Sequence, residues 1–308
     1  MSLFSSVPEP YGRYAAEHIT RLPLLAARYL RLCAAPLRER PRAPRSGRTR
    51  QRVVISLTTM PSRIGRIRPV LNSLLDQDHP ADEVLLTVPS TSQREGCPYR
   101  VPDFLRGRSA VTVLECGRDW GPATKLIPAV LREAPDTLII AVDDDNIYPR
   151  DMVSTFLRWH RQYPDAALGY RGWELPPSLD WSETQTLYAT SLPGCRRVDV
   201  VTGTWGILVQ PRFFDPQLTD YTAYPRDAFF VDDIWFNGHL ARRDVPRMVI
   251  PALFPPLPTR ASWINGLCFV ENADSTRNNN VIQAFERHWM CRRAAPASPQ
   301  GAPQRQTA

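Results

Sequence analysis

Residues 53–89 contain two strand patterns separated by a helix pattern, and this succession constrains the fold more than any other feature. VVISLTT at 53–59 is a β-branched run between Arg52 and Pro61, as expected of a buried strand. Residues 66–77 carry apolar side chains at helical spacing, and EVLLTVP at 83–89 is a second strand pattern. Because strands joined through a helix run parallel, the sequence predicts an α/β fold with a parallel sheet.

Further patterns extend this scheme along the chain. Strands are predicted at 110–117 and 137–145, a helix at 151–164, strand, turn, helix and strand between 198 and 251, and a last helix at 280–289. With 308 residues, of which 43% are hydrophobic and 22% charged, the chain can bury the core of one large α/β domain or of two small ones.

The chain is predicted to form one folded domain with an extension at each end. Residues 38–52 are rich in proline, arginine, serine and glycine and have almost nothing to bury, so they predict a linker. Residues 1–52 are therefore expected to form a basic N-terminal helical segment and linker, residues 53–290 a single domain, and residues 291–308 a disordered tail.

The net charge of +7 belongs to the two extensions. Residues 1–52 hold 11 arginines against three glutamates, whereas residues 53–290 carry four more acidic than basic side chains. A mildly acidic body offers no phosphate-binding surface overall, so no nucleic-acid partner is predicted.

Cysteine usage and hydropathy predict a cytoplasmic protein. The six cysteines form no C-x-x-C pair and suggest neither a zinc site nor a disulfide framework. No apolar run approaches the roughly 18 residues of a membrane-spanning helix. The N-terminal segment interleaves leucine with Arg21, Arg28 and Arg31. It is expected either to lie on an anionic membrane surface at the inner face of the plasma membrane, with these arginines outward, or to pack on the folded domain.

Three adjacent aspartates, Asp143, Asp144 and Asp145, follow the apolar strand and are the strongest chemical signal. Neighbouring carboxylates repel one another unless a cation or hydrogen-bond donors lie among them, and such hard oxygen ligands suit Mg²⁺ or Mn²⁺. Because side chains alternate across an extended segment, Asp143 and Asp145 are expected to face one side and hold the cation. The alternative is an acidic turn or helix cap before Asn146.

Lys125 is the single lysine in a chain with 37 arginines. A position that keeps lysine against this composition is a candidate for needing a compact ammonium group. Gly121 and Pro122 predict a tight entry to a helix, and Pro128 predicts either a kink or a helix that begins there. Since a helix entrance favours a bound anion, Lys125 is expected to contact a diphosphate shared with the divalent cation. An unselected surface lysine is the alternative.

Six stretches, taken in order, resemble bacterial GT-A-fold glycosyltransferases of the broad family 2-like superfamily of nucleotide-diphospho-sugar transferases. The stretches are VVISLTTMPSRI, LNSLLDQDHPADEVLLTVP, DWGPATKLIPAV, IIAVDDDNIYP, VTGTWGILVQPRFF and VDDIWFNGHLA. The resemblance runs from residue 53 to about residue 250. It implies a GT-A-like mixed, mainly parallel sheet flanked by helices, and a metal-dependent transferase of the EC 2.4 class.

The resemblance also implies a reaction and its substrates. A sugar would pass from a nucleotide-diphospho-sugar donor to a hydroxyl of a glycan, a lipid-linked molecule or another acceptor, with inversion at the anomeric carbon. Donor binding would fall to Ser56, Thr58, Thr59, Arg63, Lys125, Asp143 and Asp144. The D-x-D element, Asp143 and Asp145, would bind Mn²⁺ or Mg²⁺.

An acidic pair at the start of a later helix supplies the catalytic base in inverting members of that superfamily. It corresponds here to Asp232 and Asp233, with Asp233 as the base and Asp232 as its neighbour or an acceptor ligand. This chain has Asp-Asp where many members have Glu-Asp. The turn TGTWG would place Gly203 and Trp205 beside the sugar and the acceptor, although a tryptophan can equally be a core residue.

Other aromatic and histidine side chains are weaker candidates. Carbohydrate contacts are also conceivable for Trp173, Trp181, Trp235 and Trp263. A third metal ligand could come from His239 or His288, although a lone histidine is more often structural.

Two other functions fit the same residues. A metal-dependent nucleotidyl- or phosphotransferase could use these aspartates and Lys125, but the chain has no Walker-type glycine-rich loop and the VDDIW helix would have no task. A non-catalytic protein of the same fold that binds a sugar nucleotide is the second alternative.

Overall fold

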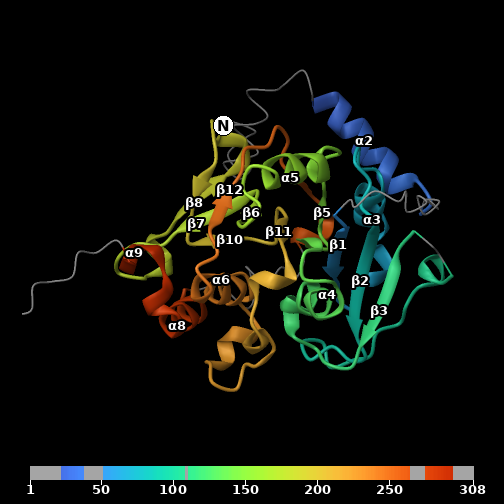
Figure 1. Ribbon diagram of the computed structural model, residues 1–308. Coiled ribbons are helices and arrows are strands. Elements are labelled where there is room, and N and C mark those ends of the chain that lie inside the picture. Colours follow the sequence, from blue (N-terminus) through green and yellow to red (C-terminus); the bar gives the residue numbers. More distant parts are fainter. Residues whose placement is uncertain (1–21, 38–50, 108–109, 264–274, 294–308) are drawn as a thin grey trace, which may run out of the picture.

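The central sheet orders its eight strands β3-β2-β1-β4-β11-β6-β12-β9 (Figure 1). The structure is a computed structural model and describes residues 22–37, 51–107, 110–263 and 275–293. The strands are β1 (Val53–Thr58), β2 (Glu83–Pro89), β3 (Thr112–Cys116), β4 (Leu138–Val142), β6 (Ala167–Gly169), β9 (Arg196–Arg197), β11 (Ile207–Val209) and β12 (Arg247–Val249). Within this sheet only β11 and β9 run against the others. The predicted mixed, mainly parallel sheet is therefore confirmed.

Two smaller sheets stand beside the central one. One orders its strands β10-β7-β8, and the other pairs β13 with β5. Their bounds are β7 (Arg171–Glu174), β8 (Gln185–Tyr188), β10 (Val200–Val201), β5 (Asn146–Ile147) and β13 (Leu257–Pro258). In Figure 1 β7 and β8 lie at the side of the molecule away from β2 and β3.

Helices cover both faces of the central sheet because its strands are apolar on both faces. Along β4, Leu138, Ile140 and Val142 pack with α3 (Arg68–Leu75) and α5 (Met152–His160). Ile139 and Ala141 point the other way and pack with α4, α6 and α8. These three helices span Ile127–Arg132, Asp232–Arg242 and Thr276–Ala284. The alternation has the period of two that an extended strand requires, and fully apolar strands are typical of a sheet covered on both sides.

The register of the sheet gathers three chain segments at one edge. Leu57 of β1 pairs with Val142 of β4, so the residues after both strands emerge side by side. Strand β11 is antiparallel to β4 and pairs Ile207 with Ala141, so the turn that precedes β11 reaches the same edge. Open α/β sheets bind their ligands at such carboxyl ends.

The helix α2 (Leu22–Ala34) packs on the folded domain beside α3 (Figure 1). Arg28 and Arg31 both pair with Asp76, at 3.3 and 2.9 Å, and Leu32 is buried. In these residues the helix therefore packs on the domain, with Arg28 directed to Asp76 and Arg31 half-exposed beside it, and contact with a membrane surface stays a prediction. Leu24 and Leu30 remain exposed, at 73% and 66%.

The predicted extensions fall largely outside the described residues. The linker at 38–50 and the tail at 294–308 belong to this part of the chain, and the boundary expected after residue 290 falls within α9 (Met290–Arg293). The last apolar helix, expected at 280–289, is instead α8 followed by a 3₁₀ turn at Glu286–His288. In the described residues no helix is long and apolar enough to cross a membrane.

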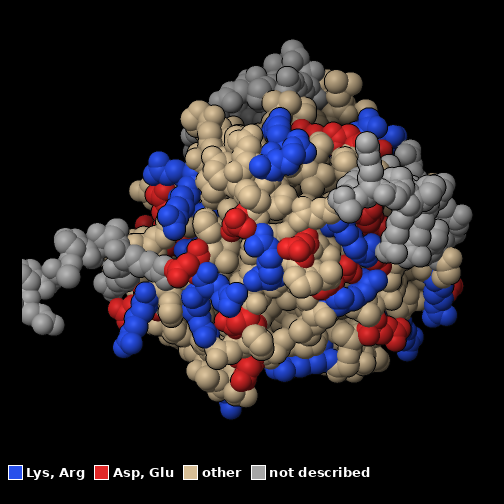
Figure 2. All heavy atoms as spheres, in the orientation of Figure 1, with Lys and Arg blue, Asp and Glu red and all other residues tan. Residues whose placement is uncertain are grey.

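The surface charge is mixed on the face that Figure 2 shows. Basic and acidic side chains are interspersed among uncharged ones over the coloured part of this face, without an extended basic stripe. This agrees with the acidic excess of residues 53–290 in the sequence.

Replacing Gly238 by alanine should destabilise the protein, although alanine is the better helix former by about 1 kcal/mol. A β-carbon at Gly238 of α6 would lie 2.4 Å from the ring of Phe285, which is 1% exposed and packed against Trp235 and Trp289. Such overpacking costs about 1–3 kcal/mol, so we expect a lower midpoint of urea unfolding. Gly194→Ala is the matched control because nothing lies within 4 Å of the added carbon, and an equal midpoint in the two variants would refute the expectation.

Candidate active site

A cavity of about 630 Å³ opens at the edge where β1, β4 and the turn before β11 meet. It brings together most of the residues singled out in the sequence, although they span 176 positions of the chain. Those that line it are Thr58, Thr59, Arg63, Lys125, Asp143, Asp144, Asp145, Trp205, Asp232 and Asp233. The sequence therefore identified the centre of the cavity.

Ser56 and Gly203 do not line the cavity but support residues that do. Ser56 is completely buried in β1, and its hydroxyl donates a hydrogen bond of 2.6 Å to the backbone oxygen of Lys125. Gly203 donates its backbone N–H to Asp233 at 2.8 Å. The expected direct contact of Ser56 and Gly203 with substrate is therefore replaced by a supporting position.

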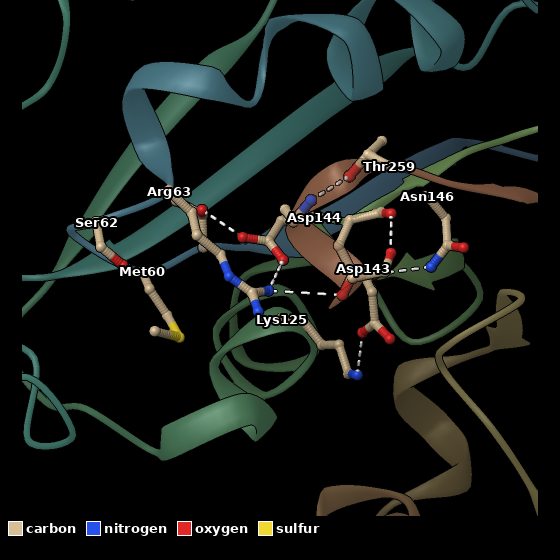
Figure 3. A network of polar contacts seen from close by, with 12 residues as sticks. Met60, Ser62, Arg63, Lys125, Asp143, Asp144, Asn146 and Thr259 are labelled. Atoms are coloured by element: carbon tan, nitrogen blue, oxygen red, sulfur yellow. Dashed lines mark hydrogen bonds and ion pairs between the residues drawn. The ribbon is translucent and has the colours of Figure 1, made fainter. Parts of the chain in front are cut away.

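The three aspartates form a turn rather than an extended segment, so their side chains do not alternate as expected. Residues 144 and 145 are the turn between β4 and β5. Arg63 reaches Asp144 at 2.9 Å (Figure 3). It also reaches Asp145, at 3.5 Å, and Thr59 donates a hydrogen bond to Asp144. Asp143 points instead to Lys125 (Figure 3). Asp144 and Asp145 therefore both pair with the guanidinium of Arg63, whereas Asp143 pairs with Lys125.

The backbone of this acidic turn is fixed from two directions. Asp143 donates its N–H to the hydroxyl of Tyr148 at 2.8 Å. The backbone oxygen of Asp145 accepts hydrogen bonds from the N–H of Thr259 and the hydroxyl of Ser262, which follow β13. The turn is therefore held in one conformation, which spares a bound ligand the entropic cost of ordering it.

Lys125 ends a short 3₁₀ helix and stands just before α4. The 3₁₀ helix spans Gly121–Lys125, and α4 begins at Ile127 with Pro128 in its first turn. Of the two alternatives for Pro128, the structure has the one in which a separate helix begins near this proline. Proline is tolerated there because the first helical N–H groups have no partner within the helix.

The ammonium group of Lys125 bridges the two acidic elements of the site. Its Nζ lies 2.5 Å from Asp143 and 2.9 Å from Asp232, and the residue is only 4% exposed. Burial acts to lower the pKa of Lys125, but the carboxylates of Asp143 and Asp232 outweigh it and raise that pKa well above its ordinary value. The interpretation as an unselected surface lysine is therefore wrong, whereas direct contact with a phosphate stays a prediction.

The space around the ammonium explains why arginine does not occupy this position. A β-carbon on Gly203 would come within 2.7 Å of Nζ, so the backbone of Gly203 lies directly against the lysine tip. The side chain of arginine has more heavy atoms than that of lysine, and its guanidinium holds the N–H donors in a rigid plane. This close contact therefore requires both the compact ammonium group of Lys125 and the absence of a side chain at Gly203.

Asp232 and Asp233 occupy the first turn of α6, where the helix dipole favours negative charge. Both residues line the cavity. Asp232 is buried against Lys125, and Asp233 accepts the N–H of Gly203 with one oxygen. Burial and the charge of Asp232 raise the pKa of Asp233 to about 7. A carboxylate with that pKa can exchange a proton near neutral pH.

The residues at the centre of the cavity suit a divalent cation. Among the described residues, Arg63 and Lys125 are the only cationic side chains that pair with the carboxylates of the site, which are Asp143, Asp144, Asp145 and Asp232. Asp233 has no ion pair within the same residues. Burial and the charges of Asp144 and Asp143 raise the pKa of Asp145 to about 7, which shows that negative charge is in excess. No three acidic, histidine or cysteine side chains of the described part converge as a full ligand set. The donor set therefore fits a cation that keeps water or substrate oxygens as further ligands.

The aromatic candidates divide into core and cavity residues. Trp235 is fully buried and donates its ring N–H to the backbone oxygen of Leu218. Trp205 is 2% exposed, packs on Tyr188 and contributes only a small part of its surface to the cavity. Trp173 and Trp181 are half-buried, line the cavity and contact each other. The side chain of Trp263 lies outside the described residues.

Neither candidate histidine reaches the acidic turn. His239 is fully buried beside Trp235, with its Nδ1 3.6 Å from Asp215, and burial lowers its pKa to about 4. His288 belongs to the 3₁₀ turn after α8, away from the cavity lining. The positions of both histidines therefore fit a structural role better than the role of a third metal ligand.

Several cavity residues escaped the sequence analysis. They are Met60, Ser92, Arg94, Tyr99, Asp119, Arg171, Tyr188, Phe229, Phe230 and Asn278. Asp119 lay within a stretch already recognised, DWGPATK, and it holds Gly121 through a hydrogen bond of 2.7 Å. Met60 also lay within a recognised stretch, VVISLTTMPSRI, where it follows β1. The remaining residues belong to none of the recognised stretches, so only the folded chain brings them to the cavity.

Solved structures of similar shape are glycosyltransferases of low sequence identity. The mannosyltransferase PcManGT from Pyrobaculum calidifontis, solved with GDP-Man and Mn²⁺, is 18% identical; the match covers 93% of this chain and 76% of that one, with a TM-score of 0.47. S. aureus TarS 1–349 with UDP-GlcNAc is 14% identical over 68% of this chain and 59% of that one, with a TM-score of 0.44.

A third similar structure is GalNAc-T7 with UDP, GalNAc and Mn²⁺, which is 9% identical over 65% of this chain and 42% of that one, with a TM-score of 0.46. The chain thus spans less than two thirds of the matched TarS and GalNAc-T7 chains. No protein-family model and no curated protein sequence matches this chain. Similarity of this degree leaves the activity to be argued from the site itself.

Replacing Lys125 by methionine should lower the free energy of unfolding by about 3 kcal/mol at pH 8, because it leaves the buried carboxylate of Asp232 and the half-buried one of Asp143 without the ammonium group that pairs with both. The deficit should shrink as the pH falls, since burial raises the pKa of Asp232 and protonation removes its unpaired charge. Lys125→Arg keeps the charge but meets Gly203, so it should lose about 1–3 kcal/mol. Urea unfolding at pH 8 and pH 6 measures both effects. Wild-type stability in both variants would show that the two pairings contribute nothing.

Proposed function

We propose that the protein is a glycosyltransferase that moves a sugar from a nucleotide-diphospho-sugar to an acceptor hydroxyl with the help of a divalent cation. The observation that supports this most is that one side chain connects the acidic turn, which would bind the metal, to the helix that carries the candidate base. Asp143 of the turn and Asp232 of α6 share the ammonium of Lys125, and Asp233 follows directly. The shared ammonium therefore fixes the position of Asp233, which would receive the acceptor proton, relative to the turn that would hold the leaving diphosphate.

The donor would occupy the part of the cavity formed by residues 58–122, and the acceptor the part formed by residues 171–278. Thr58, Thr59 and Arg63 line the first part together with Ser92, Tyr99 and Asp119. The second part is formed by residues of β7 and β8, by the turn before β11, by residues 229–234 at the start of α6 and by Asn278 of α8. A donor and an acceptor could thus meet over Asp143 and Asp233.

In the proposed reaction Asp233 takes the proton of the acceptor hydroxyl as its oxygen attacks the anomeric carbon. The bond from that carbon to the phosphate oxygen breaks, and the nucleoside diphosphate leaves with the electron pair. One oxygen of Asp233 is fixed by Gly203, and the other has no hydrogen bond within the described residues, so it can accept the proton. A single displacement of this kind inverts the anomeric configuration, which product analysis by NMR can test.

Asp143 and Asp145 would hold the divalent cation, Mn²⁺ or Mg²⁺. When bound, it would offset the charge that develops on the departing diphosphate. Lys125 contributes to the same end through the charge that it places between Asp143 and Asp232, and Arg63 keeps Asp144 and Asp145 in position.

Asp145→Ala should remove the Mn²⁺ dependence of donor binding, because it deletes a carboxylate proposed to hold the cation. In the wild type, a sugar nucleotide at 100 times its dissociation constant should add about 2.7 kcal/mol of stability in the presence of Mn²⁺. We expect most of this increment to be lost in the variant, as measured by thermal shift and titration calorimetry with UDP- and GDP-sugars. Asp165→Ala, at an exposed carboxylate far from the cavity lining, is the control. An unchanged Mn²⁺ effect in Asp145→Ala would overturn the metal assignment.

Asp233→Asn should lower kcat by about 10²- to 10⁴-fold, the usual contribution of a general base. Donor affinity should stay near the wild-type value, because the base acts on the acceptor. Release of nucleoside diphosphate and calorimetric donor titration measure the two quantities, with Asp165→Asn as the control.

The pH profile provides an independent check on this role. Asp233 is faced by Asp232, Asp143, Lys125 and the N–H of Gly203, and its pKa is raised to about 7. A base works only when deprotonated, so wild-type kcat/KM should fall as the pH drops below about 7. The residual rate of Asp233→Asn should lack this acid limb, and its persistence would assign the limb to another group.

The alternatives from the sequence make different predictions for the same assays. A phosphotransferase would move a phosphoryl or nucleotidyl group, so the acceptor product would carry phosphorus and no new glycosidic bond. A non-catalytic sugar-nucleotide binder would show the thermal shift with no release of nucleoside diphosphate on any acceptor. Mass spectrometry of the acceptor product separates these outcomes.

The location of the protein and its membrane contact also stay proposals. We place the enzyme in the cytoplasm, with its acceptors there, and assign any contact with a membrane surface to the exposed Leu24 and Leu30 of α2.

A further inference from the structure

The acceptor part of the cavity contains an arginine whose charge has no partner in the described part of the chain. Arg171 lines the cavity from β7. None of the carboxylates in the described residues lies within ion-pair distance of its guanidinium, and its Nε is buried without a hydrogen bond. A buried donor left unpaired costs stability, so this group is a candidate for pairing with a ligand.

The hairpin of β7 and β8 builds an aromatic frame around this guanidinium. Arg171 and Trp173 are two residues apart on β7 and therefore share a face, and Tyr188 of β8 pairs directly with Arg171. The guanidinium carbon lies 4.8 Å from the ring centre of Trp173 and 5.4 Å from that of Tyr188. Trp173 is itself fixed by a hydrogen bond of 2.7 Å from its ring N–H to Thr186.

This arrangement leaves the hydrogen-bonding edge of the guanidinium available. Cation–π contacts occupy the faces of the planar group, whereas its N–H donors point outward in the plane and match the two oxygens of a carboxylate or a phosphate. Trp181 lies against Trp173 and extends the aromatic wall along the cavity. Such a wall suits the apolar face of a sugar ring.

The charge of the rest of the cavity adds to the argument. An anionic group that enters this cavity meets the carboxylates Asp143, Asp145 and Asp233, which would repel it. Arg171 supplies positive charge in the acceptor part, where Arg63 and Lys125 are already engaged with aspartates. A neutral acceptor could accept hydrogen bonds from this guanidinium but would leave its charge unpaired, whereas an anionic group would do both.

We propose that the acceptor carries an anionic group, a carboxylate or a phosphate on a sugar, and that Arg171 binds this group between Trp173 and Tyr188. The proposal rests on the proposed glycosyltransferase function and names its acceptor class. Arg171 would determine specificity for the acceptor and would not contact the donor.

The test compares wild type with Arg171→Gln and Arg171→Lys. Arg158→Gln is the matched control, because Arg158 also stacks on a tryptophan, at 5.8 Å from the ring centre of Trp159, but lies outside the cavity. Three probes differ only at C6, where the charge changes: methyl glucoside, methyl glucuronide and methyl glucoside 6-phosphate. Their binding is measured by NMR titration in the presence of Mn²⁺ and nucleoside diphosphate, and circular dichroism verifies that each variant is folded.

We expect wild type and Arg158→Gln to bind one of the two anionic probes more tightly than methyl glucoside. Arg171→Gln should lose about ten- to hundredfold of that affinity, the loss of a charge-assisted hydrogen-bonded pair. Arg171→Lys should lose part of it, since lysine keeps the charge without the fork. Tighter binding of the glucuronide would identify the anionic group of the acceptor as a carboxylate, and tighter binding of the phosphorylated probe would identify it as a phosphate.

Two results would overturn the proposal. One is equal binding of the neutral and anionic probes to folded wild type. The other is a loss of UDP- or GDP-sugar affinity in Arg171→Gln, which would assign the guanidinium to the donor. A wild type that binds the anionic probe through Arg171 but neither binds nor cleaves any sugar nucleotide would instead refute the proposed function and keep the anion site, so the two failures are distinguishable.

Discussion

The ammonium of Lys125 is the interaction on which the rest of the site depends. It joins the end of β4, through Asp143, to the start of α6, through Asp232, and its own backbone is fixed to β1 by Ser56. Without this ammonium group the buried carboxylate of Asp232 would face the half-buried one of Asp143, and the two negative charges would repel each other. The acidic turn and the first turn of α6 can lie this close only because a compact cation stands between them.

The topology of the sheet explains why these elements meet. Parallel strands β1 and β4 end at the same edge, and the reversed direction of β11 returns residues 202–206 to that edge. Gly203 can then serve two neighbours, since its N–H orients Asp233 and its missing side chain makes room for Lys125. A larger residue at position 203 would disturb the proposed base and the bridging cation together.

The charges of the cavity are arranged in two groups with different tasks. At the centre, burial and the charges of neighbouring carboxylates raise the pKa of Asp145 and Asp233 to about 7, as suits the proposed site for a divalent cation and a proton. In the proposed acceptor part, Arg171 is framed by aromatic rings and makes no ion pair with the described carboxylates. Negative charge in excess at one place and an unpaired cation at another suggest two substrates of different charge distribution.

The sequence by itself determined the local elements and the residue types of the site. Apolar runs typical of a buried strand predicted β1, β2 and β4, and the aspartates after β4 were visible because charge rarely follows such a run without a task. The aspartates at the start of α6 were singled out only through the resemblance to a known superfamily. Lys125 was visible because it differs from 37 arginines. These signals are local, so the order of residues is enough to display them.

Only the tertiary structure decided which of these residues meet and how. It turned Ser56 inward to the backbone of Lys125, gave Asp144 and Asp145 a shared arginine in place of an alternating pair, and brought Arg171 from a separate hairpin into the cavity. The partner of a side chain depends on the register of strands and on the direction in which a turn leaves the sheet. Both are set by packing between segments far apart in the chain, and no local pattern of residues contains that information.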